Sequence, residues 1–178
     1  YSDKFNTQDQ NGNIHPIVPT EDKKNVEGGK TSGFVYGLDG NTNYYIYNLS
    51  MADLSTDDRY SSGFNSDEAV TATIKAFETQ ADKLDPSKPL FIMSHQPLFD
   101  RRNDNGHALE WCDAINSVAS TMDVAFFFGH NHKYDKANEY YYEKGSIMTV
   151  ATPNEGQKTY SDMPLTFTHI CAGYLEPT

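Results

Sequence analysis

Three histidines in this chain follow two apolar segments at spacings that suit the ligands of a metal ion. Gly129-His130-Asn131-His132 comes directly after residues 124–128, and Ser94-His95-Gln96-Pro97 comes directly after residues 90–93. The two histidines of the first motif alternate with one asparagine, so an extended loop would point both rings the same way. Imidazole is a common ligand of zinc, iron, manganese and nickel. The three histidines that we expect to bind metal are His95, His130 and His132.

A βαβ unit at about residues 89–128 would bring these histidines together. Residues 90–93 and 124–128 are apolar throughout, as in parallel strands that are covered on both faces by helices or by a second sheet. Residues 108–120 between them carry a buried stripe at helical spacing. Because the two strands of such a unit run parallel, both histidine motifs should leave the same edge of the sheet, and Gly129 would allow a sharp exit. The stripe of the helix consists of Ala108, Cys112, Ile115 and Ala119.

Other elements are predicted on the N- and C-terminal sides of this unit. Ser66 is a typical N-cap and opens a helix that ends before Pro86, with Asp67 and Glu68 in its first turn. Residues 51–65 show no period and are expected to be irregular. The further segments predicted as strands are 32–36 and 44–49, which form a hairpin, and 140–142, 147–151 and 166–174.

The composition limits the classes of partner. The chain has 178 residues, with 25 acidic and 14 basic side chains and a formal net charge of −11. This charge argues against binding to a nucleic-acid backbone or to an anionic membrane surface. No apolar stretch approaches the roughly 18 residues that cross a bilayer, so we expect no membrane insertion. Cys112 and Cys171 are expected to be small buried side chains rather than a disulfide, and His15 and His169 to be structural or surface residues.

The two histidine motifs resemble the last two signature motifs of the calcineurin-like metallophosphoesterases, which include purple acid phosphatases and bacterial phosphodiesterases. Tyr134, which soon follows the second motif, and the closing segment 167–175 are also similar to that family. The resemblance implies an α/β fold, in which residues 31–178 form the C-terminal half of a four-layer αββα sandwich. Residues 1–30 are polar, rich in Asn, Asp, Gln and Gly, and are expected to form a lead-in or loop.

The resemblance also implies the activity. The expected enzyme is a binuclear metal-dependent phosphohydrolase, which cleaves a small-molecule phosphate mono- or diester through a metal-activated hydroxide. His95 and His130 would bind one metal ion and His132 the other, with zinc, manganese or iron as the metals. The candidates for substrate binding are Arg101, His107 and Asn131, since an arginine can pair with a phosphate oxygen.

The sequence departs from the family pattern in one respect. The family has three further motifs, of the kinds DxH, GDxxD and GNH[DE], which supply a bridging aspartate, other ligands and the histidine that protonates the leaving group. None of them occurs in these residues. We therefore interpret the chain as a piece of a longer protein, whose N-terminal half would complete the site. By itself the chain should hold metal at partial occupancy at most, and we assign no catalytic residue.

Two alternatives stay open. One is a catalytically incomplete or decayed phosphoesterase-fold scaffold that binds one structural metal ion. The presence of DxH and GDxxD motifs upstream of Tyr1 would favour the enzyme over this scaffold. The other is a mononuclear metal-binding module of an unrelated α/β fold, which a topology with His95 and His130 on strands that are not neighbours would favour. The sequence does not determine the compartment, although few cysteines, an acidic surface, and abundant Tyr and Asn favour a bacterial secreted or cell-surface protein over a cytosolic one.

Overall fold

The computed structural model describes residues 7–8, 14–15, 32–38, 40, 42–54, 65–99, 106–129, 141–152 and 159–172. The helices in these residues are α2 (Met51–Leu54), α3 (Asp67–Ala81) and α4 (Ala108–Ala119). Their strands are β1 (Thr7–Gln8), β2 (Ile14–His15), β3 (Gly33–Tyr36), β4 (Tyr45–Leu49), β5 (Leu90–Ser94), β6 (Val124–Phe128), β7 (Tyr141–Tyr142), β8 (Ile147–Thr152), β9 (Thr159–Pro164) and β10 (Thr168–Cys171).

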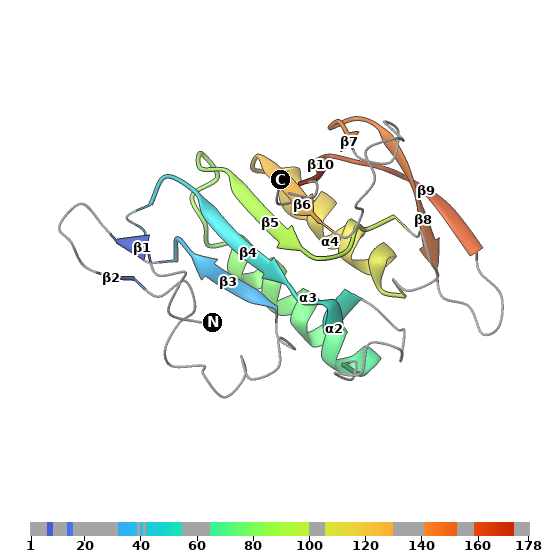
Figure 1. Cartoon of the computed structure of the whole chain (residues 1–178), viewed down its shortest axis with the longest axis horizontal. Helices are drawn as coiled ribbons and strands as arrows, with labels where there is room; N and C mark the ends of the chain where they lie inside the picture. The colour runs from blue at the N-terminus through green and yellow to red at the C-terminus, as the bar shows by residue number, and fades with distance from the viewer. Residues whose placement is uncertain are drawn as a thin grey trace, which may run out of the picture.

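A mixed sheet of six strands forms the centre of the fold, in the order β3-β4-β5-β6-β10-β7 (Figure 1). The four central strands run parallel, and the two edge strands β3 and β7 run antiparallel to their neighbours. β5 and β6 pair in register from Leu90↔Val124 to Ser94↔Phe128, with α4 between them in the chain. The α/β class, the βαβ unit and the β3–β4 hairpin that the sequence predicts are therefore confirmed.

The helix predicted from Ser66 is also confirmed. The Ser66 side chain accepts a hydrogen bond from the backbone N–H of Ala69 at 3.3 Å and so caps α3. Phe77 of α3 packs against Trp111 of α4 and Tyr47 of β4, with ring centroids 5.7 and 4.7 Å away. These three aromatic rings join both helices to one face of the sheet and form the centre of the core.

α3 and α4 lie on the same face of the sheet, behind the central strands in Figure 1. The strand order explains this arrangement. β4, β5 and β6 follow one another in a single direction, so two right-handed crossovers place both helices on one side. On the opposite face Met93 is 43% exposed. The sequence predicts that β5 and β6 are covered on both faces, and the described parts of the chain cover one of them.

A row of aromatic side chains crosses the open face. It consists of Tyr36, Tyr44, Phe91 and Phe127, with successive ring centroids 4.9, 5.8 and 6.1 Å apart. Tyr36 joins this aromatic row because the pairing of β3 with β4 shifts register between Phe34 and Tyr36. Phe34 itself packs on the helix face, against Tyr47 and Phe77. The bulge thus sends two nearby aromatic residues to opposite faces.

A β8–β9 hairpin packs against α4. The sequence predicted β8 but not β9, whose residues Thr-Tyr-Ser-Asp-Met-Pro mix polar and apolar types without a clear strand period. Met148 and Val150 of β8 are buried. The Asn116 side chain of α4 accepts from the Thr166 N–H at 2.8 Å and donates to the Pro164 carbonyl at 3.0 Å, so α4 holds the hairpin in place.

Two smaller differences from prediction concern short elements. α2 forms a helical turn within residues 51–65, which we expected to be irregular. β1 and β2 pair as a two-residue ladder inside the predicted lead-in. No disulfide joins Cys112 and Cys171; Cys112 is buried, as predicted, whereas Cys171 is only half-buried. None of the helices described has the length and apolar character needed to cross a bilayer.

Candidate metal centre

The four parallel strands end together at one edge of the sheet. Their last residues stand next to one another in the order Leu49, Ser94, Phe128 and Cys171. In open α/β sheets ligands bind beyond the carboxyl ends of the parallel strands. The His95 motif follows β5 at this edge, and Gly129 of the second motif follows β6.

A backbone hydrogen bond joins the two histidine motifs. The carbonyl oxygen of His95 accepts the N–H of Gly129 at 3.2 Å, one residue beyond the paired ends of β5 and β6. The His95 side chain is exposed. Gly129 does not have a positive φ, and a Cβ built there would meet no atom within 4 Å. Neither the backbone conformation nor the space at position 129 therefore requires glycine, and the contribution of Gly129 is its N–H.

Several predicted site residues lie outside the residues that the structure describes. They are His130, His132, Asn131 and Arg101. Within the described part no group of three or more His, Cys, Asp or Glu side chains could hold a metal ion, and the expected partners of His95 lie outside that part. The ligand set of three histidines stays a prediction.

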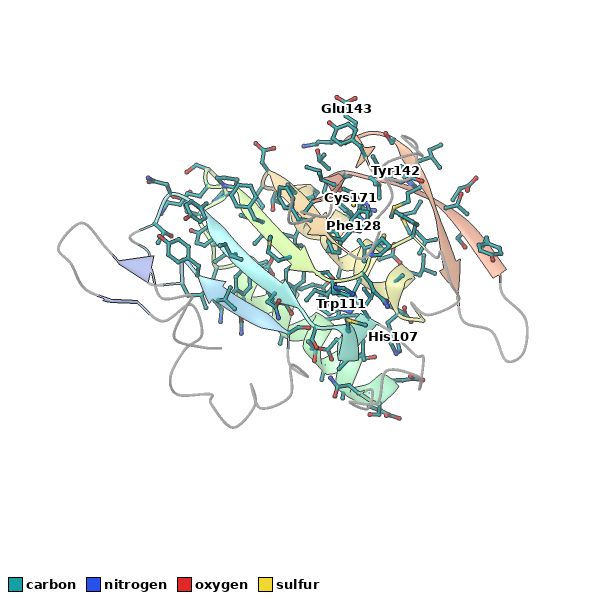
Figure 2. The ribbon with its side chains drawn as sticks, in the orientation of Figure 1. His107, Trp111, Phe128, Tyr142, Glu143 and Cys171 are labelled. Carbon is teal, nitrogen blue, oxygen red and sulfur yellow. The ribbon has the colours of Figure 1, made fainter. Side chains whose placement is uncertain are left out.

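His107 is placed among the helices. Its backbone N–H donates to the Leu54 carbonyl at 3.1 Å, and its imidazole lies 3.6 Å from the Asp67 carboxylate and 3.9 Å from that of Glu110. His107 is 7% exposed. Figure 2 shows it beside Trp111 and apart from the side chains grouped around β10. These contacts join α2, α3 and α4; a role in substrate binding stays a prediction.

Buried polar atoms without partners gather around the His95 motif. Among the described side chains these atoms are Ser94 Oγ, Gln96 Oε1 and His169 Nδ1. Ser94 and Gln96 flank His95 in the chain, and His169 binds the loop three residues further on. A buried polar group without a hydrogen bond costs about 1–3 kcal/mol, so folded proteins hold few of them. Two of the three atoms thus belong to residues that adjoin His95 in the chain, and the third belongs to a residue that binds the same segment.

Asp53 is a buried carboxylate near the same edge that we did not single out from the sequence. It follows β4 in α2 and is fully buried. Its carboxylate accepts the N–H and hydroxyl of Ser32 at 3.1 and 2.6 Å and the amide of Asn65 at 2.5 Å. Because these donors occupy its oxygens, Asp53 fixes the segment after β4. No local pattern in the acidic stretch around it signals this role.

Comparison of the chain with protein-family models, with curated proteins and with solved structures found no match. The family resemblance therefore depends on the two histidine motifs and their setting. The structure brings the starts of these motifs together on neighbouring strands, whereas strands that are not neighbours would have favoured the alternative of an unrelated mononuclear module.

Proposed function

We propose that this chain is the C-terminal part of a metal-dependent phosphoesterase that hydrolyses a phosphate mono- or diester. The observation that supports this most directly is the hydrogen bond from Gly129 N–H to the His95 carbonyl. His130 is the next residue after Gly129 in the chain, so the two motifs start from adjacent points of one sheet edge. Bound metal ions at such an edge would lower the pKa of a water molecule and neutralise charge on the phosphate.

The residues of this chain would divide the work in the following way. His95 and His130 would hold one metal ion and His132 the other. Ser94 and Gln96 each keep a buried oxygen without a partner beside His95, and these oxygens would orient polar groups that enter the site. Arg101, His107 and Asn131 are the proposed contacts to the substrate, in which arginine would pair with a phosphate oxygen.

We further infer that a second sheet covers the open face, which would complete an αββα sandwich. The aromatic row and the exposed Met93 form an apolar sheet face that the described helices leave uncovered. Contiguous apolar surface of this kind marks an interface. Sheets that pack face to face lie about 10 Å apart and interdigitate such side chains. The N-terminal half of the domain would supply this sheet and the carboxylate ligands.

A metal-dependent assay of two chain lengths tests the proposal. The chain, and a form extended at its N-terminus, would be incubated with Mn²⁺ or Zn²⁺ and an aryl phosphate monoester or diester. We expect turnover by the extended form that is lost in His95→Ala and in His130→Ala. His15→Ala is the matched control, since it removes a histidine from β2, outside the proposed site, and should keep turnover.

The outcomes separate the two remaining candidates. Metal-dependent turnover that needs both histidines supports the enzyme. Metal binding by the extended form without turnover of either ester would instead support a scaffold that keeps one structural ion. Absence of metal binding in both forms would contradict both candidates, because each requires the three histidines to form a site.

A further inference from the structure

His169 lies fully buried on β10, against the strand that leads to Gly129. Its ring stacks on Phe126 and Phe128 of β6, with centroids 5.0 and 4.7 Å away and ring planes inclined by 12° and 28°. Phe99 and Tyr142 contact it edge-on, at 5.6 and 6.0 Å. Burial lowers the pKa of His169 to about 3, so the imidazole is neutral at pH 7.

The neutral imidazole has one polar partner among the described residues. Its Nε2 accepts the backbone N–H of Leu98 at 3.2 Å, across 71 positions of the chain. A neutral imidazole whose Nε2 accepts carries its proton on Nδ1, and this Nδ1 is buried without a partner. A phenyl ring would pack in the same place without that unpaired donor. What the histidine adds to the pocket is therefore the acceptor for Leu98.

This hydrogen bond anchors the far end of the His95 motif. At the near end, the His95 carbonyl binds Gly129 N–H at 3.2 Å. At the far end, Leu98 binds His169, and Leu98 and Phe99 are buried beside β6 and β10. The short segment from His95 to Leu98 is thus fixed at two points. One is Gly129, just beyond β6, and the other is His169 on β10. Its backbone has little freedom left, although the His95 side chain itself is exposed.

We propose that His169 is a positioning residue of the metal centre, because its Nε2 holds Leu98 and thereby sets the place of His95 beside Gly129. The metal part of this inference depends on the proposed function, and the anchoring part does not. His169 touches no substrate or metal in this role. It acts through the backbone of the segment that carries His95.

Two substitutions separate the acceptor from the packing. His169→Phe keeps a flat ring between Phe126 and Phe128 and removes the acceptor. His169→Gln loses the ring that stacks on Phe126 and Phe128 and keeps an amide oxygen near the position of Nε2. Val150→Ala is the matched control, since it removes buried apolar volume from β8, which pairs with β9 and not with the six-stranded sheet. If only packing mattered, His169→Phe would be the milder of the two substitutions at this position.

Amide hydrogen exchange of the chain by NMR tests the anchoring. In His169→Phe we expect the Leu98 and Gly129 amides to exchange at least about tenfold faster, which is the size of effect expected from the loss of one buried hydrogen bond. In His169→Gln they should stay close to the wild type. Unchanged exchange of Leu98 in His169→Phe would overturn the inference, whatever the protein does with metal.

Zn²⁺ titration of the same variants by calorimetry tests the consequence for the site. We expect His169→Phe to bind Zn²⁺ about tenfold more weakly than the wild type, and His169→Gln to recover most of the affinity. Val150→Ala should lower the melting temperature and leave Zn²⁺ affinity unchanged. Equal affinity of the wild type and His169→Phe would overturn the positioning role. If the wild type and its N-terminally extended form bind no Zn²⁺, the proposed function fails, and Leu98 exchange still decides the anchoring.

Discussion

The backbone carbonyl of His95 accepts the backbone N–H of Gly129 at 3.2 Å, one residue past the point where β5 and β6 end together. Thirty-four positions separate these residues in the chain, yet the hydrogen-bond ladder of the two strands continues into both loops. Each loop opens a histidine motif. The pairing therefore gives the proposed metal centre a fixed backbone frame, which is how a rigid scaffold positions ligands on loops.

A substitution to proline removes the Gly129 N–H that the His95 carbonyl accepts. Gly129→Pro lacks the N–H, and Phe128 before it is already in a strand conformation that a following proline tolerates. We expect this variant to lose most of its Zn²⁺ affinity. Gly129→Ala keeps the N–H and places its Cβ in open space, so it should bind Zn²⁺ as the wild type does. Calorimetric titration measures both, and equal affinities would show that the backbone link does not matter for the site.

The folded chain should become less stable as the pH falls, because of His169. Its pKa is about 3 in the folded chain against an ordinary value of 6.5, so the unfolded state binds a proton that the folded state does not. The free energy of unfolding is therefore lost as pH falls below about 6.5, by about 2 kcal/mol between pH 7 and 5 from this group. Asp85, whose pKa hydrogen bonds from Ser87 hold below its usual range, acts only at lower pH. Urea unfolding at pH 7, 6 and 5 measures how the free energy of unfolding changes with pH. We expect a smaller change in His169→Gln than in the wild type. An identical change in the two proteins would contradict the role given to His169.

Asp53 should be among the least replaceable polar side chains of the described fold. Asp53→Ala leaves the buried N–H of Ser32 without its acceptor and opens a gap beside α2. We expect a loss of about 3 kcal/mol in the free energy of unfolding. Asp82→Ala, at the exposed end of α3, is the control and should leave denaturant unfolding nearly unchanged. A loss equal to that of the control would mean that the Ser32 contacts are replaced by water.

Glycine is required at the turn after β3. Gly37 has a φ of +100°, and a Cβ there would lie 2.6 Å from Tyr45 Cδ1 and 2.7 Å from the Tyr44 carbonyl oxygen. Gly145 has a φ of +94° with open space around it. Gly145→Ala should cost about 1 kcal/mol from backbone strain, and Gly37→Ala about 2–4 kcal/mol because a steric clash adds to the strain. Thermal unfolding of both variants compares their losses of stability. A larger loss in Gly145→Ala than in Gly37→Ala would contradict this prediction.

The elements that were predicted well are those whose signals are local. The apolar runs of β5 and β6 and the helical stripe of α4 identify the βαβ unit. Ser66 marks the start of α3 through a side-chain cap that needs only the next three residues. β9 was missed because its residues show no clear strand period, although it pairs with the preceding strand β8. α2 was missed because it depends on the hydrogen bonds between Asp53 and the distant Ser32.

By itself, the sequence determined the class of fold, the parallel pairing of the two strands that carry histidine motifs, and the residue types offered for chemistry at their ends. Tertiary structure decided the rest. The order of β4, β5 and β6 placed both helices on one face and left the aromatic row uncovered. The contact between His169 and Leu98 spans 71 positions, and its acceptor role depends on burial that no short window of sequence records. Local periodicity reports which residues share a face, whereas hydrogen bonds between distant segments depend on the path of the whole chain.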